Sequence, residues 1–101
     1  VSLAANVRRE AAARGLSPDR VVFSHLFDED TQHRVKSLAD LFLDTFTFNA
    51  HTTAYEAIYG GLPILTLANE TQPSRVACSL AAAAGHPFLC ARSPADYAAL
   101  A

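Results

Sequence analysis

Apolar positions recur at helical spacing over several parts of the chain. Leu3, Val7 and Ala11 form one stripe of an amphipathic segment that ends at Gly15. Later segments show either similar spacing or the residues that start and stop helices, such as Pro73 in a first turn. We therefore expect helices over residues 1–15, 28–39, 53–59 and 71–84, and from residue 93 onward.

Short apolar runs lie between the expected helices. They cover residues 21–23, 40–45, 62–67 and 87–90. The centre of the run 40–45 lacks alternation, which suits a strand that is covered on both faces, as in a parallel sheet. Strands separated by helices predict an α/β fold, in which a Rossmann-like parallel sheet is flanked by helices and the crossovers are right-handed.

Length and composition agree with one small α/β domain over residues 1–101. The chain has 101 residues, of which 50% are hydrophobic and 18% charged, and this suffices for a single modest core. It begins and ends inside expected helices and offers about four strands, fewer than a complete nucleotide-binding sheet carries. We therefore expect it to be a fragment of a longer protein.

Charge and cysteine content narrow the choice of partner and compartment. Eight Lys and Arg stand against ten Asp and Glu, without a basic block, so neither nucleic acid nor a membrane surface is expected as a partner. Cys78 and Cys90 lie twelve residues apart without a CxxC motif, and we expect reduced, buried thiols rather than a disulfide. With no signal peptide and no run of roughly 20 apolar residues, we expect a soluble, cytoplasmic protein.

The polar triplet His51-Thr52-Thr53 lies between an expected strand and an expected helix. Open α/β sheets bind ligands at the carboxyl ends of their strands, and a helix start presents unpaired N–H groups. The two hydroxyls, the imidazole and these N–H groups could hold a diphosphate, and Glu56 could accept the hydroxyls of a ribose. Thr53 and Glu56 also fit a capping box, in which they only stabilise the helix start. No GxGxxG motif or P-loop lysine is present, and the spacing leaves both interpretations open.

Other candidate sites give weaker signals. The histidines at 25, 33 and 51 lack the close spacing of zinc ligands, and we expect no metal site. Ser74 and Arg75 follow Pro73 at another helix start. They could be a cap and a solvated charge, or they could contribute to a ligand pocket in the neighbouring crevice.

Four motifs in a fixed order carry a resemblance to a known family. They are LFLDT, NAHTT, GLPILT and ETQPSRVA, within residues 39–80, and RREAAARGLSPDRVVF precedes them. This text resembles the C-terminal catalytic lobe of O-GlcNAc transferases and of the related SPINDLY-type glycosyltransferases, which follows tetratricopeptide repeats. The resemblance implies part of a GT-B enzyme with two Rossmann-like lobes. Such an enzyme transfers N-acetylglucosamine from UDP-GlcNAc to Ser or Thr of acceptor proteins, with inversion and without a metal or other cofactor.

The resemblance also implies roles for individual residues. His51, Thr52 and Thr53 would bind the diphosphate of UDP, while His33 and Glu56 would contact the uridine and its ribose. It assigns no general base within this chain, and the lysine that the family uses on the diphosphate lies outside it. We therefore expect the fragment to be inactive by itself. Its expected partners are the remaining lobe and the tetratricopeptide repeats of the full-length chain.

Two segments depart from the family pattern, and rival functions remain. Asp28-Glu29-Asp30 stands where members carry a Pro-rich or Lys-containing stretch, and we expect these acids to form the solvated first turn of a helix. Phe46-Thr47-Phe48 replaces a sequence of the Leu-Pro-Tyr type. The alternatives to an enzyme are a non-catalytic nucleotide-binding module and a purely structural α/β module.

Overall fold

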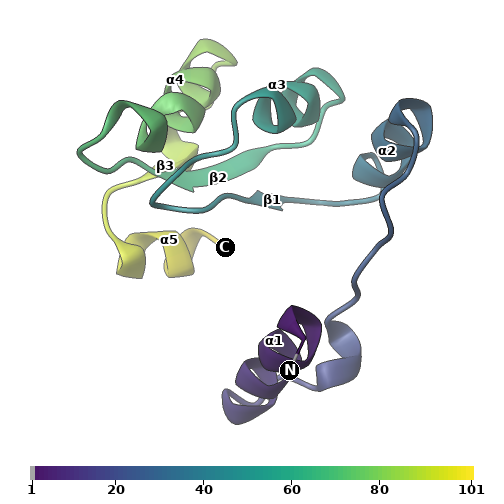
Figure 1. Cartoon of the computed structure of the whole chain (residues 1–101). Helices are drawn as coiled ribbons and strands as arrows, with labels where there is room; N and C mark the ends of the chain where they lie inside the picture. Colours follow the sequence, from purple (N-terminus) through teal and green to yellow (C-terminus); the bar gives the residue numbers. More distant parts are fainter. Residues whose placement is uncertain (1) are drawn as a thin grey trace.

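A parallel sheet forms the centre of the computed structural model, which describes residues 2–101 (Figure 1). Its three strands are β1 (Phe42–Leu43), β2 (Ile64–Leu67) and β3 (Cys90–Ala91), in the spatial order β1-β2-β3. Phe42 is in register with Ile64, and Thr66 with Cys90. The predicted α/β fold with a parallel sheet is confirmed.

Helices cover both faces of the sheet. The helices α3 (Thr52–Tyr59) and α4 (Val76–Ala83) lie on one face, and α5 (Pro94–Leu100) lies on the other (Figure 1). Every residue of β2 is buried, which explains its lack of alternation, and Thr66 is its one polar residue. Two clusters make up the core, one with Ala54, Ile64, Ala77 and Ala81, the other with Leu65, Leu67 and Ala91.

The N-terminal helix lies apart from the sheet. In Figure 1, α1 (Leu3–Ala13) and the short 3-10 helix η1 (Pro18–Arg20) are joined by an extended segment to α2 (Glu29–Lys36), which precedes β1. The Nε atom of Arg8 donates a hydrogen bond of 3.2 Å to the carbonyl oxygen of Val21, and its guanidinium lies 5.3 Å from the ring centre of Phe23. These contacts hold the start of the extended segment against α1.

The strand expected at residues 21–23 does not form, so that prediction is wrong. In the part of the chain that the structure describes, these residues pair with no strand, and Val22 is 82% exposed. A β-branched run becomes a strand only when a neighbour accepts its hydrogen bonds, and here Arg8 binds the carbonyl of Val21 instead.

Two further expected elements differ from the structure, and in both a short 3-10 helix with a proline near its start takes the place of part of the element. Pro87–Leu89 forms a 3-10 helix, η3, so that pairing in β3 begins only at Cys90. The expected helix 71–84 is divided, because Gln72–Ser74 forms a separate 3-10 turn, η2, before α4 begins. Pro87 has no N–H with which to extend the ladder of β3 toward its start.

Cys78 and Cys90 form a disulfide, and the expectation of free thiols is wrong. The chain turns back after α4 at Gly85, whose φ of 86° favours glycine, and this brings β3 alongside α4. The two Cα atoms are 5.2 Å apart as a result, within the normal range for a disulfide. The expectation of a cytoplasmic location rested partly on reduced thiols. Without that support it stays a prediction. Among residues 2–101, no helix has the length and apolar character that crossing a membrane requires.

Reducing the disulfide is expected to lower the free energy of unfolding by about 2–4 kcal/mol, because the cross-link restricts the unfolded chain. Denaturant unfolding with and without dithiothreitol measures this difference. The double variant Cys78→Ala with Cys90→Ala is the control, since its unfolding should not respond to the reductant. Titration of two free thiols in the unreduced protein would contradict the cross-link.

Candidate functional site

His51, Thr52 and Thr53 lie together where β1 leads into α3, at the carboxyl edge of the sheet (Figure 1). Both threonines are exposed. His51 is the N-cap residue of α3, and no side chain among residues 2–101 caps this helix start. The N–H groups of the first turn therefore remain able to bind an anion.

The imidazole of His51 is held in a defined orientation. Its ring stacks on Phe48, with the ring centres 4.7 Å apart and the planes at 8°. Its Nε2 atom lies 3.3 Å from the carbonyl oxygen of Pro73. A carbonyl oxygen can only accept, so we assign the ring hydrogen to Nε2, which leaves Nδ1 for another partner.

Glu56 binds a lysine instead of the helix start. Its carboxylate forms a hydrogen-bonded ion pair with the Nζ atom of Lys36, which lies on α2 (Glu29–Lys36). The capping-box interpretation of Thr53 and Glu56 is therefore wrong. The helix also starts two residues too early for a capping box, because His51 and not Thr53 is the N-cap residue.

The ion pair lowers the pKa of Glu56. The hydrogen bond from Lys36 is the main cause, while the charges of Lys36 and His33 act in the same direction and desolvation opposes them. The side chains of Lys36 and Glu56 are 16% and 31% exposed, so the pair is partly shielded from water. It also fixes α2 against α3.

His33 belongs to the same contact between α2 and α3. Its side chain is 41% exposed, and Nε2 lies 4.0 Å from Oε1 of Glu29, one turn earlier. His33 precedes Lys36 by three residues on α2, and Lys36 binds Glu56 of α3. The structure thus places the two residues predicted to contact the uridine on helices that touch each other.

The acidic run forms the exposed first turn of α2, as expected. Asp28 is the N-cap residue, and its carboxylate accepts hydrogen bonds from the N–H (3.0 Å) and the hydroxyl (2.8 Å) of Thr31. These bonds, the backbone one first, hold the pKa of Asp28 below its ordinary value. Glu29 and Asp30 follow in the first turn, where carboxylates suit the helix dipole.

Asn49 links the loop before α3 to α4, a role that the sequence did not reveal. Its side chain is fully buried, donates to the carbonyl of Thr45 at 2.8 Å and accepts from the N–H of Ala77 at 3.3 Å. Its own N–H donates to Pro73, the residue that also contacts His51. Three side chains thus contact predicted site residues or their neighbours, namely Asn49, Phe48 and Lys36. These contacts are visible only in the structure, because they join residues in ways that the sequence pattern does not indicate.

Ser74 and Arg75 differ in their surroundings. Ser74 is buried, and its hydroxyl donates to the carbonyl of Thr71 at 2.7 Å, so this side chain is structural. Arg75 is exposed, and its Nη1 atom donates to the carbonyl of Asn69 at 3.1 Å. Arg75 also lines an open depression in the loop after β2, together with Glu70.

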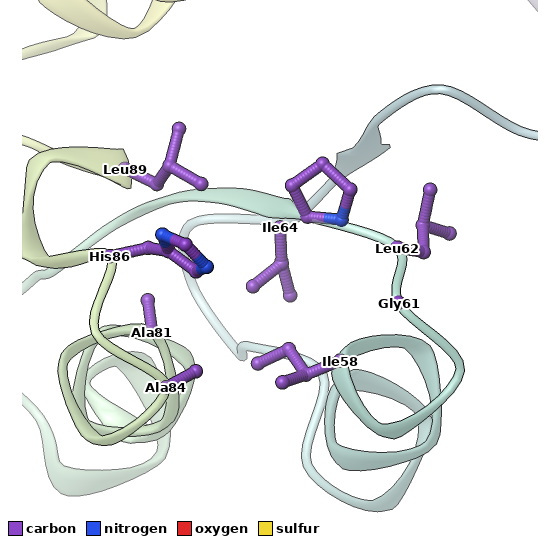
Figure 2. Close-up of a pocket in the computed structure, with 9 residues that line it drawn as sticks. Ile58, Gly61, Leu62, Ile64, Ala81, Ala84, His86 and Leu89 are labelled. Atoms are coloured by element: carbon purple, nitrogen blue, oxygen red, sulfur yellow. The ribbon is translucent and has the colours of Figure 1, made fainter.

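An apolar cavity of about 300 Å³ lies at the opposite edge of the sheet (Figure 2). It is bounded by the end of α3, the beginning of β2 and the end of α4, with His86 as its ionisable lining residue. The triplet at residues 51–53 begins α3, whereas the cavity lies at its end, so the two are separate. In residues 2–101, no three His, Cys, Asp or Glu side chains gather so that they could hold a metal ion.

Comparison with known proteins gives consistent matches over nearly the whole chain. A family model described as "Glycosyl transferase family 41" matches residues 2–101. The UDP-N-acetylglucosamine–peptide N-acetylglucosaminyltransferase of Caenorhabditis elegans is 38% identical over 96 residues, which are 95% of this chain and 8% of that protein. The probable enzyme SEC of Arabidopsis thaliana, with the same activity in its name, is 40% identical over 78 residues, 77% of this chain and 8% of that protein.

A solved structure of similar shape agrees with these matches. A mutant O-GlcNAc transferase of Thermobaculum terrenum superposes with a TM-score of 0.87 at 26% identity, over 93% of this chain and 18% of that one. The chain therefore spans less than a fifth of that structure, and it spans 8% of the length of the two curated relatives.

Replacing Lys36 with Met is expected to raise the pKa of Glu56, because the variant lacks the donor that stabilises the carboxylate. NMR titration of the side-chain carboxyl carbon measures the change. Arg34→Met removes an exposed charge from the same helix and should leave Glu56 nearly unchanged.

The same lowered pKa sets the direction of the pH dependence. The pair stabilises the folded state above the ordinary pKa of a glutamate, and this contribution is lost as the pH falls through the lowered pKa of Glu56. The stability difference between the unsubstituted protein and Lys36→Met should therefore shrink in acid. Equal pKa values for Glu56 in the two proteins would contradict the pair.

Proposed function

This chain belongs to glycosyl transferase family 41, and we propose that it is the UDP-sugar-binding part of a protein O-glycosyltransferase. The reaction would transfer N-acetylglucosamine from UDP-GlcNAc to Ser or Thr hydroxyls of proteins. The relatives' names, which specify UDP-N-acetylglucosamine and a peptide acceptor, support this choice of donor and acceptor. The observation that carries the proposal is the helix start at His51-Thr52-Thr53, which no described side chain caps.

The diphosphate of UDP would bind at the start of α3. The exposed hydroxyls of Thr52 and Thr53 and the N–H groups of the first turn are donors, and the helix dipole favours negative charge there. Nδ1 of His51 adds a donor when the ring is protonated, since Nε2 faces Pro73. These groups keep their positions while charge develops, which favours departure of UDP.

The uridine and its ribose would lie beside the contact between α2 and α3. The ion pair with Lys36 leaves acceptor positions free on the carboxylate of Glu56, because its two oxygens offer about four lone-pair sites. Its side chain is 31% exposed and can therefore reach a ribose hydroxyl. His33, on the neighbouring helix, is half-exposed and can contact the uridine.

In the proposed reaction, the acceptor hydroxyl attacks the anomeric carbon of the sugar while the bond to UDP breaks. The configuration at this carbon inverts, and the role of this chain is to bind UDP and to stabilise the charge on the leaving diphosphate. No residue of the chain is proposed as the general base. Activity would therefore need the remaining lobe and the acceptor-binding parts of the full-length protein.

Replacing His51 with Ala in the full-length protein is expected to weaken UDP binding about tenfold or more, the effect of losing a hydrogen bond to a charged group. Isothermal titration calorimetry measures the affinity, with UMP as the ligand that lacks the second phosphate. His86→Ala is the matched control, because this histidine lies at the apolar cavity. A lower melting temperature with unchanged UDP affinity would contradict the assignment.

Transfer requires a separate measurement. The full-length protein is expected to release UDP from UDP-GlcNAc faster when acceptor proteins are present, and mass spectrometry should find N-acetylhexosamine on their Ser or Thr residues. His51→Ala should slow both, because it removes stabilisation of the leaving group. Tight UDP binding without any transfer would indicate a non-catalytic nucleotide-binding module instead.

A further inference from the structure

Asp44 is a buried carboxylate beside the proposed diphosphate site, and the reaction does not use it. It follows β1 directly and is 5% exposed. Its Oδ2 atom accepts a hydrogen bond of 2.7 Å from the hydroxyl of Thr66, and its Oδ1 atom accepts one of 2.8 Å from the N–H of Ala50. Thr66 is fully buried in the central strand, and Ala50 immediately precedes His51.

We propose that Asp44 and Thr66 are positioning residues for the diphosphate site, an assignment that rests on the proposed function. The hydroxyl of Thr66 orients the carboxylate of Asp44, and the carboxylate fixes the N–H of Ala50. The central strand thereby sets the place of His51 and the first turn of α3. Neither residue needs to touch the nucleotide.

Several contacts make this arrangement rigid. The main-chain N–H of Asp44 donates to the carbonyl of Leu65 at 3.0 Å, and its carbonyl accepts from the hydroxyl of Tyr97 at 3.0 Å. Asp44 is thus bonded to β2 and to α5 as well as to the loop. Burial, and to a lesser degree the charge of Asp44, raises the pKa of Tyr97, which keeps its hydroxyl protonated as a donor.

Hydrogen bonds within the loop between β1 and α3 restrict its conformation. Thr45 donates its hydroxyl to the carbonyl of Phe48, and Asn49 donates to the carbonyl of Thr45, so the segment is closed on itself. A closed loop moves as a unit when its attachment to the sheet changes. Loss of the contact between Thr66 and Asp44 should therefore displace His51, whose ring stacks on Phe48.

Two substitutions of Thr66 separate positioning from stability. Thr66→Val keeps the volume but removes the donor to Asp44, whereas Thr66→Ser keeps the hydroxyl and loses a buried methyl group. In the full-length protein, we expect Thr66→Val to weaken UDP binding about tenfold, because the start of α3 would then hold the binding geometry in only about a tenth of the molecules. We expect Thr66→Ser to retain the affinity within about twofold despite a lower melting temperature.

Calorimetry with UDP, melting temperatures and hydrogen exchange at the N–H of Ala50 test the assignment together. The expected signature is faster exchange and weaker binding in Thr66→Val only. Equal losses of affinity in both variants, or unchanged affinity in Thr66→Val, would overturn the positioning role while UDP binding by the unsubstituted protein still supports the proposed function. Absence of UDP binding in the unsubstituted protein would overturn the proposed function and this role with it. Calorimetry of the unsubstituted protein gives this result before any variant is measured, so the two failures can be told apart.

Discussion

The hydrogen bonds around Asp44 connect the sheet, the proposed site and the helix on the far face. Its carboxylate bonds Thr66 of β2 and Ala50 of the loop, while its main chain bonds Leu65 and Tyr97. A buried carboxylate is costly unless donors surround it, so these partners stabilise the buried position of Asp44. The hydrogen bonds of Asp44 therefore hold the polar start of α3 in place relative to β2, the most buried strand.

The start of α3 is polar and its end is apolar, so the proposed binding site and the apolar cavity lie at different ends of the helix. At its start, the exposed threonines and His51 face the carboxyl edge of the sheet. At its end, Ile58 and Gly61 border the apolar cavity beside His86 (Figure 2). A short helix whose middle packs on β2 through Ala54 can hold a polar site at one end without burying it in the core.

Local sequence patterns predicted the elements better than their long-range contacts. The parallel sheet and the acidic first turn of α2 follow from patterns within a few residues, and both are confirmed. The strand expected at residues 21–23 failed because strand formation depends on a partner elsewhere in the chain. The disulfide was missed for a related reason, since spacing says nothing of how the turn after α4 brings Cys78 to Cys90. For the proposed site, the pattern placed residues 51–53 at a helix start, as the structure does, but it could not show that Lys36, twenty positions before Glu56, would bind that carboxylate.

The pair of Lys36 and Glu56 joins the two helices that carry the proposed nucleotide contacts. His33 lies on α2 and the triplet at residues 51–53 on α3, so this pair links the uridine part of the site to the diphosphate part. Partly exposed ion pairs contribute little to stability, because water screens them. The main effect of the Lys36–Glu56 pair is therefore to limit how α2 can move relative to α3. If the pair opened, α2 could shift with His33 while the Asp44 contacts kept His51 in place, so the two parts of the site depend on different constraints.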